Sequence, residues 1–232
     1  LGSKNLIDCC TNNKVKKIVF LSTDKAVYPI NAMGMSKALM EKTLISESNI
    51  KNNSKTKMSI VRYGNVMFSR GSVIPLFMKQ ILQNKEITIT DKEMTRFWLS
   101  LDDAINLVLF AISSNDNGSI FIKKAPSCKI LDLAKVLNKI LNKKNKIKII
   151  GKRHGEKIHE TLASSSELLT ATEYLDYYKV PSDKRSLNYK NYYDVGNKKN
   201  LLNDYSSDKT KILNPKELEA LLLKFSEVKK NI

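Results

Sequence analysis

The stretch Ser22–Lys42, STDKAVYPINAMGMSKALMEK, indicates the fold, because it continues a buried strand through a turn into a helix. The strand is the β-branched and aromatic run KKIVFLS, which predicts a strand over residues 17–22. Pro29 ends the turn, and apolar residues then recur at the spacing of an amphipathic helix over residues 32–47. Open α/β sheets bind ligands at the carboxyl ends of their strands. We therefore expect the chemistry of this protein where this strand ends.

Strand and helix patterns alternate along most of the remaining chain. Further strands are expected over residues 59–63, 86–90, 119–122 and 146–150. Further helices are expected over residues 4–10, 73–83, 131–141 and 216–229, from the capping pair Ser100 and Asp103 to Ile112, and briefly after Gly155. Between residues 164 and 208 the sequence shows neither the helical nor the strand periodicity of apolar residues. We expect an extended, partly ordered segment there. The predicted fold class is α/β.

The composition is that of a globular protein. Apolar residues make up 42% of the 232 positions, which is enough to fill one large domain or two small ones. No apolar run reaches the length of about 18 residues that indicates a membrane helix, and the start LGSKNLIDCC lacks the order of a secretory signal. We therefore expect a soluble cytoplasmic protein with no membrane segment. Cys9 and Cys10 are adjacent and Cys128 is alone, so no disulfide framework is predicted.

The net charge of +17 raises the question of nucleic-acid binding. The basic residues are scattered through the chain, however, and do not alternate with aromatic residues as base-stacking surfaces require. We expect no nucleic-acid partner, while small phosphorylated ligands remain compatible with the charge. A metal site is not expected either, because His154 and His159 are five residues apart and would not share a helical face.

The helix of the opening stretch carries Met33 and Lys37 four residues apart, so their side chains share one face. Thr-Asp-Lys followed by Met-x-x-x-Lys resembles the extended short-chain dehydrogenase/reductases, whose catalytic helix carries Tyr-x-x-x-Lys. With VRYGNVMFSRGSVIPLF, MTRFWLSLDDA and GEKIHE, the pattern resembles more narrowly the UDP-N-acetylglucosamine 4,6-dehydratases that also invert carbon 5, found in capsule and O-antigen sugar biosynthesis. The tail VPSDKRSLNYKNYY is similar to the extension of the branch that makes precursors of N-acetyl-L-fucosamine. The resemblance covers nearly the whole chain and implies that Met33 is a feature of that branch.

The resemblance also implies roles for the residues at the strand end. A hydride would pass from carbon 4 of the sugar to NADP and return to carbon 6, while water would leave across carbons 5 and 6, and each step needs a positioned acid or base. Asp24 would protonate the departing hydroxyl, Lys25 would remove the carbon-5 proton, and Lys37 would hold the nicotinamide ribose. Because a thioether exchanges no proton, either Thr23 or Lys25 would relay the proton that the tyrosine handles in other members.

A UDP-sugar presents two phosphates, a flat uracil and a polar ring, so its site needs guanidinium groups, backbone groups and an amide. The resemblance implies that Tyr63 and Gly64 border the nicotinamide. It implies that UDP-N-acetylglucosamine or a related UDP-sugar is bound by Asn65, Arg70, Val73, Ile89, Thr90, Arg96, Arg153 and Glu156. Helix amides near Val73 would receive phosphate oxygens, and the backbone of Ile89 and Thr90 would pair with uracil. Arg96 and Arg153 would clamp the diphosphate.

Three consecutive regions are expected. Residues 1–72 would form the C-terminal part of a Rossmann-like, doubly wound parallel sheet, residues 73–163 a small α/β substrate-binding domain, and residues 164–232 a C-terminal extension. No G-x-G-x-x-G turn occurs among the eight glycines, although the resembled enzymes bind the dinucleotide pyrophosphate with such a turn. We therefore expect an N-terminally truncated chain that lacks about three βαβ units of about 30 residues each. At full length we expect a homo-oligomer.

The leading expectation is an NADP-dependent dehydratase with 5-epimerase activity that makes a UDP-4-keto-6-deoxy sugar for surface polysaccharide. Two alternatives stay open. A UDP-sugar 4-epimerase would need the tyrosine that Met33 replaces and would have little use for Asp24 and Lys25. A non-catalytic NADP-sensing or interaction module of the same fold would permit the loss of the tyrosine, but the retained Asp24 and Lys25 speak against it.

Overall fold

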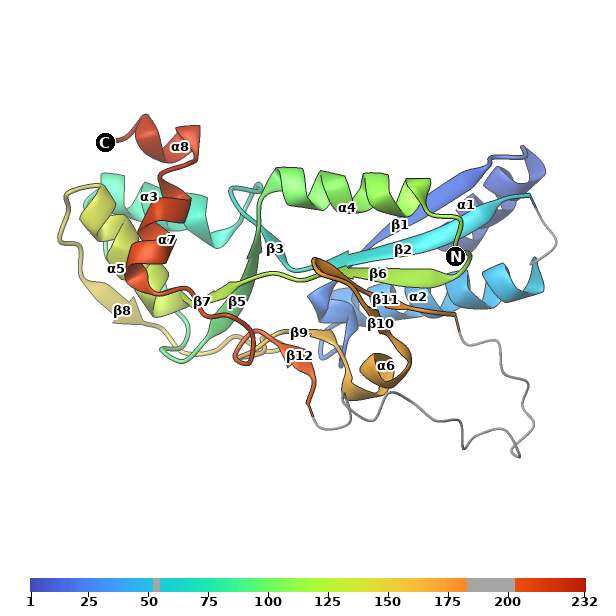
Figure 1. The fold of residues 1–232 in the computed structure, drawn as a ribbon. Coiled ribbons are helices and arrows are strands. Elements are labelled where there is room, and N and C mark those ends of the chain that lie inside the picture. Colours follow the sequence, from blue (N-terminus) through green and yellow to red (C-terminus); the bar gives the residue numbers. More distant parts are fainter. Residues whose placement is uncertain (52–54, 183–202) are drawn as a thin grey trace. The chain divides into compact units, whose positions relative to one another are not determined.

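The structure is a computed structural model that describes residues 1–51, 55–182 and 203–232. The chain forms two compact units, each assembled from three separated stretches of sequence. Unit 1 comprises Leu1–Tyr63, Asp102–Lys124 and Thr161–Tyr205, and unit 2 comprises Gly64–Leu101, Ala125–Glu160 and Ser206–Ile232. Figure 1 labels the elements of both units. The division into three consecutive regions stays a prediction of the sequence.

The centre of unit 1 is a five-stranded sheet. Its strands follow the order β1 (Lys17–Thr23), β2 (Lys57–Tyr63), β6 (Ser119–Lys123), β11 (Tyr177–Val180) and β10 (Thr172–Glu173). The first three strands are parallel, and the last two join them in antiparallel pairing. The run MSIVRY in β2 is almost wholly buried, as expected for a parallel strand covered on both faces. In the register of β1 and β2, Thr23 lies beside Tyr63.

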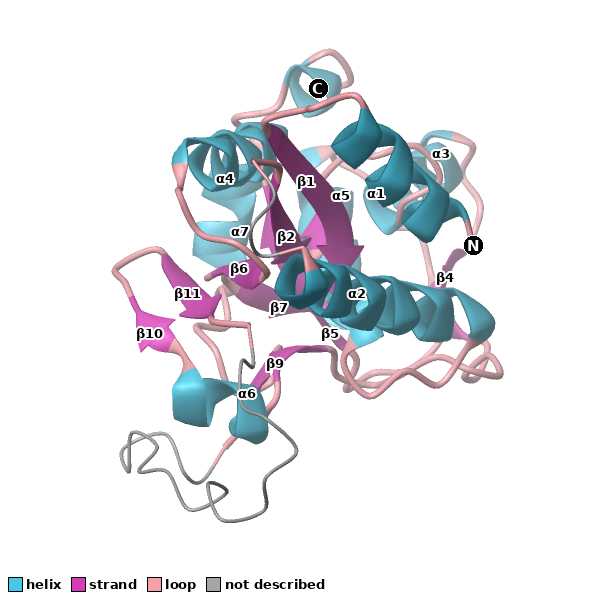
Figure 2. Cartoon of the chain, turned by 90° about the vertical axis from the view of Figure 1, so that its right-hand side faces the viewer, coloured by secondary structure: helices cyan, strands magenta, loops and turns pink. Residues whose placement is uncertain are grey.

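Helices cover both faces of this sheet. Unit 1 contains α1 (Gly2–Asn12), η1 (Asp24–Ala26), α2 (Ala32–Ile50), α4 (Leu101–Ser113, which begins in unit 2), β9 (Thr161–Ala163) and α6 (Ser165–Thr170). Helix α4 and helix α2 lie on opposite faces, as Figures 1 and 2 show. Leu107 of α4 packs with Val61 and Phe121, which are fully buried in the sheet. The doubly wound parallel arrangement predicted from the sequence is therefore present.

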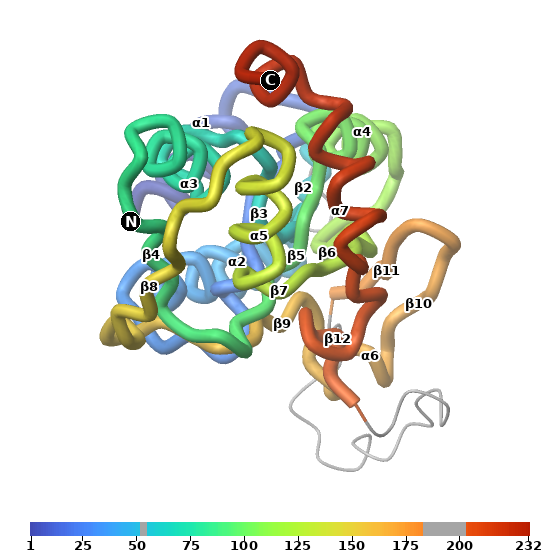
Figure 3. The backbone as a smooth tube through the Cα atoms, turned by 90° about the vertical axis from the view of Figure 1, so that its left-hand side faces the viewer, coloured from blue at the N-terminus to red at the C-terminus, as the bar shows by residue number. Residues whose placement is uncertain are grey.

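Unit 2 has its own core. Its elements are β3 (Asn65–Val66), α3 (Val73–Leu82), β4 (Ile87–Ile89), β5 (Thr95–Leu99), β7 (Ser127–Lys129), α5 (Ile130–Ile140), β8 (Ile147–Ile149), α7 (Pro215–Leu222) and α8 (Ser226–Lys229). A further strand, β12 (Tyr205–Ser206), lies at the boundary of the two units in the sequence. Strands β3, β5 and β7 form one sheet, and β4 pairs with β8. Helix α5 lies between α3 and α7 (Figure 3), and Phe77, Trp98 and Leu133 are buried in this core.

Three sequence expectations about local structure need correction. The helix expected after Gly155 is absent, because the carbonyls of Lys157 and Ile158 accept hydrogen bonds from Arg96 instead of from amides in a following helical turn. The final helix is interrupted between α7 and α8, where the ring of Phe225 packs 4.7 Å from that of Phe68.

The segment after Ser164 was expected to be extended, yet it forms α6, β10 and β11. Helix α6 begins with a capping box between Ser164 and Glu167, and the ring of Tyr177 on β11 lies 4.4 Å from that of Phe110. Local capping and aromatic packing therefore create order where hydrophobic periodicity is weak. Residues 183–202, which are part of the same expectation, lie outside the described residues. Among the described helices, none is long and apolar enough to cross a membrane.

Candidate functional site

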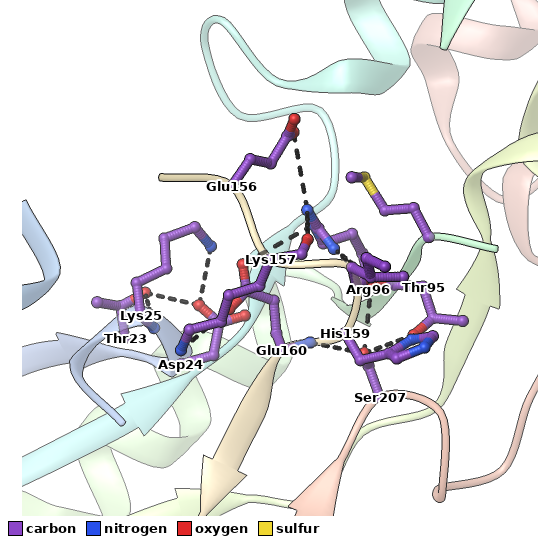
Figure 4. A network of polar contacts seen from close by, with 12 residues as sticks. Thr23, Asp24, Lys25, Thr95, Arg96, Glu156, Lys157, His159, Glu160 and Ser207 are labelled. Atoms are coloured by element: carbon purple, nitrogen blue, oxygen red, sulfur yellow. Dashed lines mark hydrogen bonds and ion pairs between the residues drawn. The ribbon is translucent and has the colours of Figure 1, made fainter. Parts of the chain in front are cut away.

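The residues at the end of β1 form a compact polar group in unit 1 (Figure 4). Thr23 ends the strand, and the 3-10 turn η1 follows immediately with Asp24 and Lys25. The hydroxyl of Thr23 donates to Oδ1 of Asp24 at 2.8 Å and accepts from the backbone N–H of Lys25 at 3.4 Å. Nζ of Lys25 lies 2.9 Å from the same Oδ1. The side chains of Thr23 and Lys25 therefore converge on one carboxylate oxygen of Asp24, the residue between them.

The other oxygen of this carboxylate is buried and has no protein donor among the described residues. Asp24 is fully buried, and its Oδ2 has no hydrogen-bond partner among the residues that the structure describes. A buried carboxylate oxygen without a donor is costly, so proteins seldom retain one without a purpose. The second oxygen of Asp24 is therefore a candidate contact for a ligand, and the predicted catalytic role of Asp24 stays a prediction.

The start of α2 packs against this turn. Asn31 caps the helix by accepting from the N–H of Gly34 at 2.8 Å. A Cβ at Gly34 would overlap the carbonyl oxygen of Lys25, so only glycine permits this close approach. One turn along the helix from Met33, which is 48% exposed, Nζ of Lys37 donates to the carbonyl of Leu21 at 3.0 Å. Met33 and Lys37 thus lie on the helix that adjoins Lys25, as the sequence suggested.

The chain after β2 places the next predicted residues. Tyr63 is the last residue of β2, and burial raises the pKa of its phenol above the ordinary value. Gly64 follows, and Asn65 opens β3, where its backbone pairs with Trp98 of β5. Oδ1 of Asn65 is buried and has no hydrogen-bond partner within the described ranges. A side-chain amide in this state is suited to a polar ligand.

Arg96 organises a loop in unit 2 (Figure 4). Its Nη1 donates to the carbonyls of Thr95 at 2.7 Å and Ile158 at 2.9 Å, and its Nη2 donates to the carbonyl of Lys157 at 2.8 Å. Carboxylates of Glu156 and Glu160 lie 3.8 and 3.9 Å from the guanidinium. The Arg96 side chain is thus largely engaged by the protein, and its predicted role as a phosphate clamp remains a prediction.

The neighbouring loop brings two more predicted residues together. The backbone N–H of Arg153 donates to Oε2 of Glu156 at 3.4 Å, and the N–H of Glu156 donates to the carbonyl of Arg153 at 3.2 Å. Arg153 is exposed. Glu156 therefore lies beside both arginines that were predicted to bind the diphosphate, and the exposed guanidinium of Arg153 is the more accessible of the two.

His159 and Ser207 fasten the same loop to β5. Nδ1 of His159 lies 2.8 Å from Oγ1 of Thr95, and the hydroxyl of Ser207 lies 2.6 Å from that Oγ1 and accepts from the N–H of Glu160 at 2.9 Å. Thr95 and Ser207 are buried, so these contacts are part of the core of unit 2. Within the described residues no group of three or more His, Cys, Asp or Glu side chains could hold a metal ion.

The remaining predicted substrate residues have different surroundings. Arg70 is exposed in the turn before α3, and Val73 is the first residue of that helix. Ile89 is buried in β4, where its carbonyl accepts from the N–H of Ile150 at 2.8 Å. Thr90 donates from Oγ1 to the sulfur of Met94 at 3.4 Å. The backbone of Ile89 is thus already part of a strand pair, and its pairing with uracil stays a prediction.

Sequence reasoning did not single out one buried cluster in unit 1. Arg62 of β2 is 1% exposed and forms ion pairs with Glu41 of α2 and Glu167 of α6. The available signal was an arginine inside the otherwise apolar run MSIVRY, since a charged residue in a buried strand requires partners. The identity of those partners was not visible in the sequence.

Family comparison agrees with this architecture. Residues 1–182 match the family described as polysaccharide biosynthesis protein, and residues 183–229 match the description polysaccharide biosynthesis protein C-terminal. The chain therefore belongs to the polysaccharide biosynthesis protein family.

Proteins named UDP-glucose 4-epimerase are similar along the whole chain. Those of Rickettsia rickettsii (strain Sheila Smith) and Rickettsia prowazekii (strain Madrid E) are 52% and 51% identical to it over 233 residues. The matched region covers 100% of this chain and 68% of each relative. The chain therefore matches about two thirds of the length of these relatives.

Solved structures share the fold. The X-ray structure of Pen from Bacillus thuringiensis has a TM-score of 0.85 and 36% identity, and the match covers 97% of this chain and 67% of that one. The UDP-glucose 4-epimerase of Thermus thermophilus, in a complex with NAD, has a TM-score of 0.57 at 21% identity, over 67% of this chain and 58% of that one. At that identity the likeness concerns the fold alone. The predicted Rossmann-like α/β fold is confirmed.

Proposed function

We propose that this chain carries catalytic residues of a UDP-N-acetylglucosamine 4,6-dehydratase that also inverts carbon 5 and supplies a UDP-4-keto-6-deoxy sugar for surface polysaccharide. The observation that carries the proposal is the buried carboxyl of Asp24, with Nζ of Lys25 at 2.9 Å from Oδ1 and with Oδ2 unpartnered among the described residues. An elimination needs an acid and a base close together, and this turn holds both kinds of group. The family description supports a place in polysaccharide biosynthesis.

The residues of the turn would divide the work as follows. Elimination breaks the C5–H and C6–O bonds, forms a C5=C6 double bond and releases water. Lys25, in its neutral form, would accept the carbon-5 proton, and Asp24 would protonate the departing carbon-6 hydroxyl through Oδ2. Thr23 would hydrogen-bond the carbon-4 oxygen, and either Thr23 or Lys25 would take up the proton of the carbon-4 hydroxyl when that carbon loses its hydride. Return of the proton to the opposite face of carbon 5 would invert that centre.

The proposed hydride carrier is NADP, which when bound supplies reversible hydride uptake from carbon 4 and its return at carbon 6. The residues present fit the nicotinamide ribose, because Nζ of Lys37 lies at the carboxyl end of β1 with the carbonyl of Leu21 at 3.0 Å. Lys37 would hold the ribose hydroxyls, and Tyr63, paired in register with Thr23, would border the nicotinamide.

Residues of unit 2 would bind the nucleotide part of the substrate. Exposed Arg153 would contact the diphosphate, and Arg96 would hold the loop that carries Glu156 and Lys157. The unpartnered Oδ1 of Asn65 would accept a hydrogen bond from a sugar hydroxyl. UDP-sugar binding is supported by the name that the relatives with 52% and 51% identity carry.

A UDP-sugar 4-epimerase is the second candidate, and the relatives named UDP-glucose 4-epimerase favour it. That reaction needs one proton acceptor at the carbon-4 hydroxyl. Met33 has no exchangeable proton, so Thr23 or Lys25 would have to act there. Asp24 would have no evident task in an epimerase, which is why we place the dehydratase first.

One experiment separates the two candidates. The catalytically competent protein that contains this chain is incubated in deuterium oxide with NADP and either UDP-N-acetylglucosamine or UDP-glucose, and the products are followed by NMR. A dehydratase with 5-epimerase activity converts UDP-N-acetylglucosamine to a 4-keto-6-deoxy sugar with deuterium at carbon 5. Formation of UDP-galactose, or of the carbon-4 epimer of UDP-N-acetylglucosamine, without loss of the carbon-6 hydroxyl would replace the proposal by the epimerase.

A further inference from the structure

A buried charged cluster lies next to the two strand ends that carry Thr23 and Tyr63. Its centre is Arg62, the residue before Tyr63 in β2. Its partners come from three other elements of unit 1: Glu41 of α2, Leu162 of β9 and Glu167 of α6. We call Arg62, Glu41, Glu167 and Ser22 the Arg62 cluster.

Every donor of the Arg62 guanidinium is used. Nε donates to Oε1 of Glu41 at 3.0 Å, and Nη2 donates to Oε2 of Glu41 at 2.6 Å and to Oε1 of Glu167 at 2.9 Å. Nη1 donates to Oε2 of Glu167 at 3.0 Å and to the carbonyl of Leu162 at 2.8 Å. A guanidinium has five N–H groups in a rigid plane, so this arrangement permits one orientation of the side chain. Because α2, β9 and α6 carry the acceptors, these elements are fixed in position relative to Arg62.

Two of the partners, Glu41 and Leu162, lead to the β1 turn. Glu41 accepts from the hydroxyl of Ser22, the residue before Thr23. Glu41 also follows Lys37 by one turn of α2, so the same carboxylate orients the helix face that carries Lys37. Strand β9, whose Leu162 carbonyl binds Arg62, contacts η1, where Asp24 and Lys25 lie.

Stability alone does not account for such a cluster. One guanidinium and two carboxylates leave a net negative charge in a buried place, and replacing buried ion pairs by apolar side chains of similar size is often neutral or stabilising. A network in which every donor has an acceptor in a fixed direction permits only one arrangement of its side chains. That property matters most beside residues whose position controls a reaction.

We infer that Arg62 is a positioning residue: through Glu41, Ser22 and Leu162 it holds η1 and α2 in the arrangement that aligns Asp24, Lys25 and Lys37. Glu167 closes the network from α6 and fixes the orientation of the guanidinium. The catalytic consequence rests on the proposed function, whereas the structural consequence does not.

The test uses Glu167→Gln in the catalytically competent protein that contains this chain. Arg62→Ala would leave two buried carboxylates unpaired and unfold the unit, but Glu167 is 20% exposed and Arg62 keeps Glu41 when Glu167 is neutralised. The matched control is Glu173→Gln, which removes the exposed ion pair with Lys124 in the same unit. Hydrogen exchange of backbone amides is measured by mass spectrometry, together with kcat and KM for UDP-N-acetylglucosamine.

In Glu167→Gln we expect amides of residues 23–27 and 161–168 to exchange at least about tenfold faster than in the wild type, and the increase should be clearly larger there than in residues 57–61 and 119–123. The kcat should fall about tenfold or more while KM stays within about twofold, because misalignment affects the reaction more than binding. Glu173→Gln should change neither quantity. Uniformly faster exchange, unchanged local exchange, or an unchanged kcat in Glu167→Gln would overturn the inference.

If the wild type converts no UDP-sugar, the proposed function fails. The exchange measurement needs no substrate and still decides whether the Arg62 cluster holds η1.

Discussion

Gly34 lies directly against the carbonyl of Lys25: a Cβ at this glycine would overlap the carbonyl oxygen and would lie 3.2 Å from Cβ of Pro29. The first turn of α2 and the turn η1 therefore touch through backbone atoms. This contact places the helix that bears Met33 and Lys37 beside Asp24 and Lys25.

Gly34→Ala should consequently destabilise unit 1. Although alanine favours a helix by about 0.5–1 kcal/mol over glycine, the added methyl group must displace backbone, and overpacking of this kind costs about 1–3 kcal/mol. We expect a net loss in the free energy of unfolding, measured by urea denaturation. Gly2→Ala in α1 is the matched control, because nothing lies within 4 Å of a Cβ there, and it should be neutral or slightly stabilising. Equal stability of the two variants would contradict the close approach.

Lys25, and not Met33, should carry proton transfer at carbon 5. Lys25→Ala should abolish deuterium incorporation from solvent at carbon 5 and reduce dehydration by about 10²-fold or more, the usual loss for a missing general base. Met33→Leu keeps the volume and the apolar character of a side chain that is 48% exposed, so most activity should remain. NMR of the products in deuterium oxide measures both effects. Exchange at carbon 5 at the wild-type rate in Lys25→Ala would move the base to another residue.

Arg96 and Arg153 should respond differently to truncation. Arg153→Ala should raise KM for the UDP-sugar with little change in kcat or in thermal stability, because its side chain is exposed. Arg96→Ala should raise KM and also lower the melting temperature, because three carbonyls lose the donors that Arg96 provides. Steady-state kinetics and thermal denaturation of both variants check this. A large fall in kcat at constant KM would instead give Arg96 a part in the chemistry.

The Arg62 cluster should make unit 1 sensitive to acid. Burial of Glu167 opposes its ionisation, but the charge of Arg62 and hydrogen bonds from Arg62 and Ser164 outweigh burial, so the pKa of Glu167 lies below its ordinary value of 4.5. A carboxyl with a lowered pKa in the folded state stabilises the fold above the ordinary pKa, and this contribution is lost as the pH falls through the folded-state value.

The free energy of unfolding of the wild type should therefore exceed that of Glu167→Gln at pH 7, and the difference should shrink below about pH 4.5. Chemical denaturation at several pH values measures it. A difference between the two proteins that is independent of pH would show that the ionised form of Glu167 is not what stabilises the fold.

Much of the local structure could be predicted from the sequence. The apolar run at residues 17–22 and the helical spacing that follows predicted β1 and α2, because hydrophobic periodicity reports which face of an element is buried. Thr23, Asp24 and Lys25 are consecutive, so their grouping at a strand end needed no knowledge of distant contacts. The helix expected after Gly155 was wrong because Arg96, about sixty positions earlier, binds the carbonyls of that loop.

Tertiary structure alone decided the Arg62 cluster and the loop around Arg96. Arg62 meets Glu41 across 21 positions and Glu167 across 105, and no periodic pattern links residues so far apart. Which carboxylate reaches a buried guanidinium depends on strand order, on register and on the faces that helices present. These are set by the packing of whole elements, whereas the sequence by itself specified the elements and the reactive residues at the end of β1.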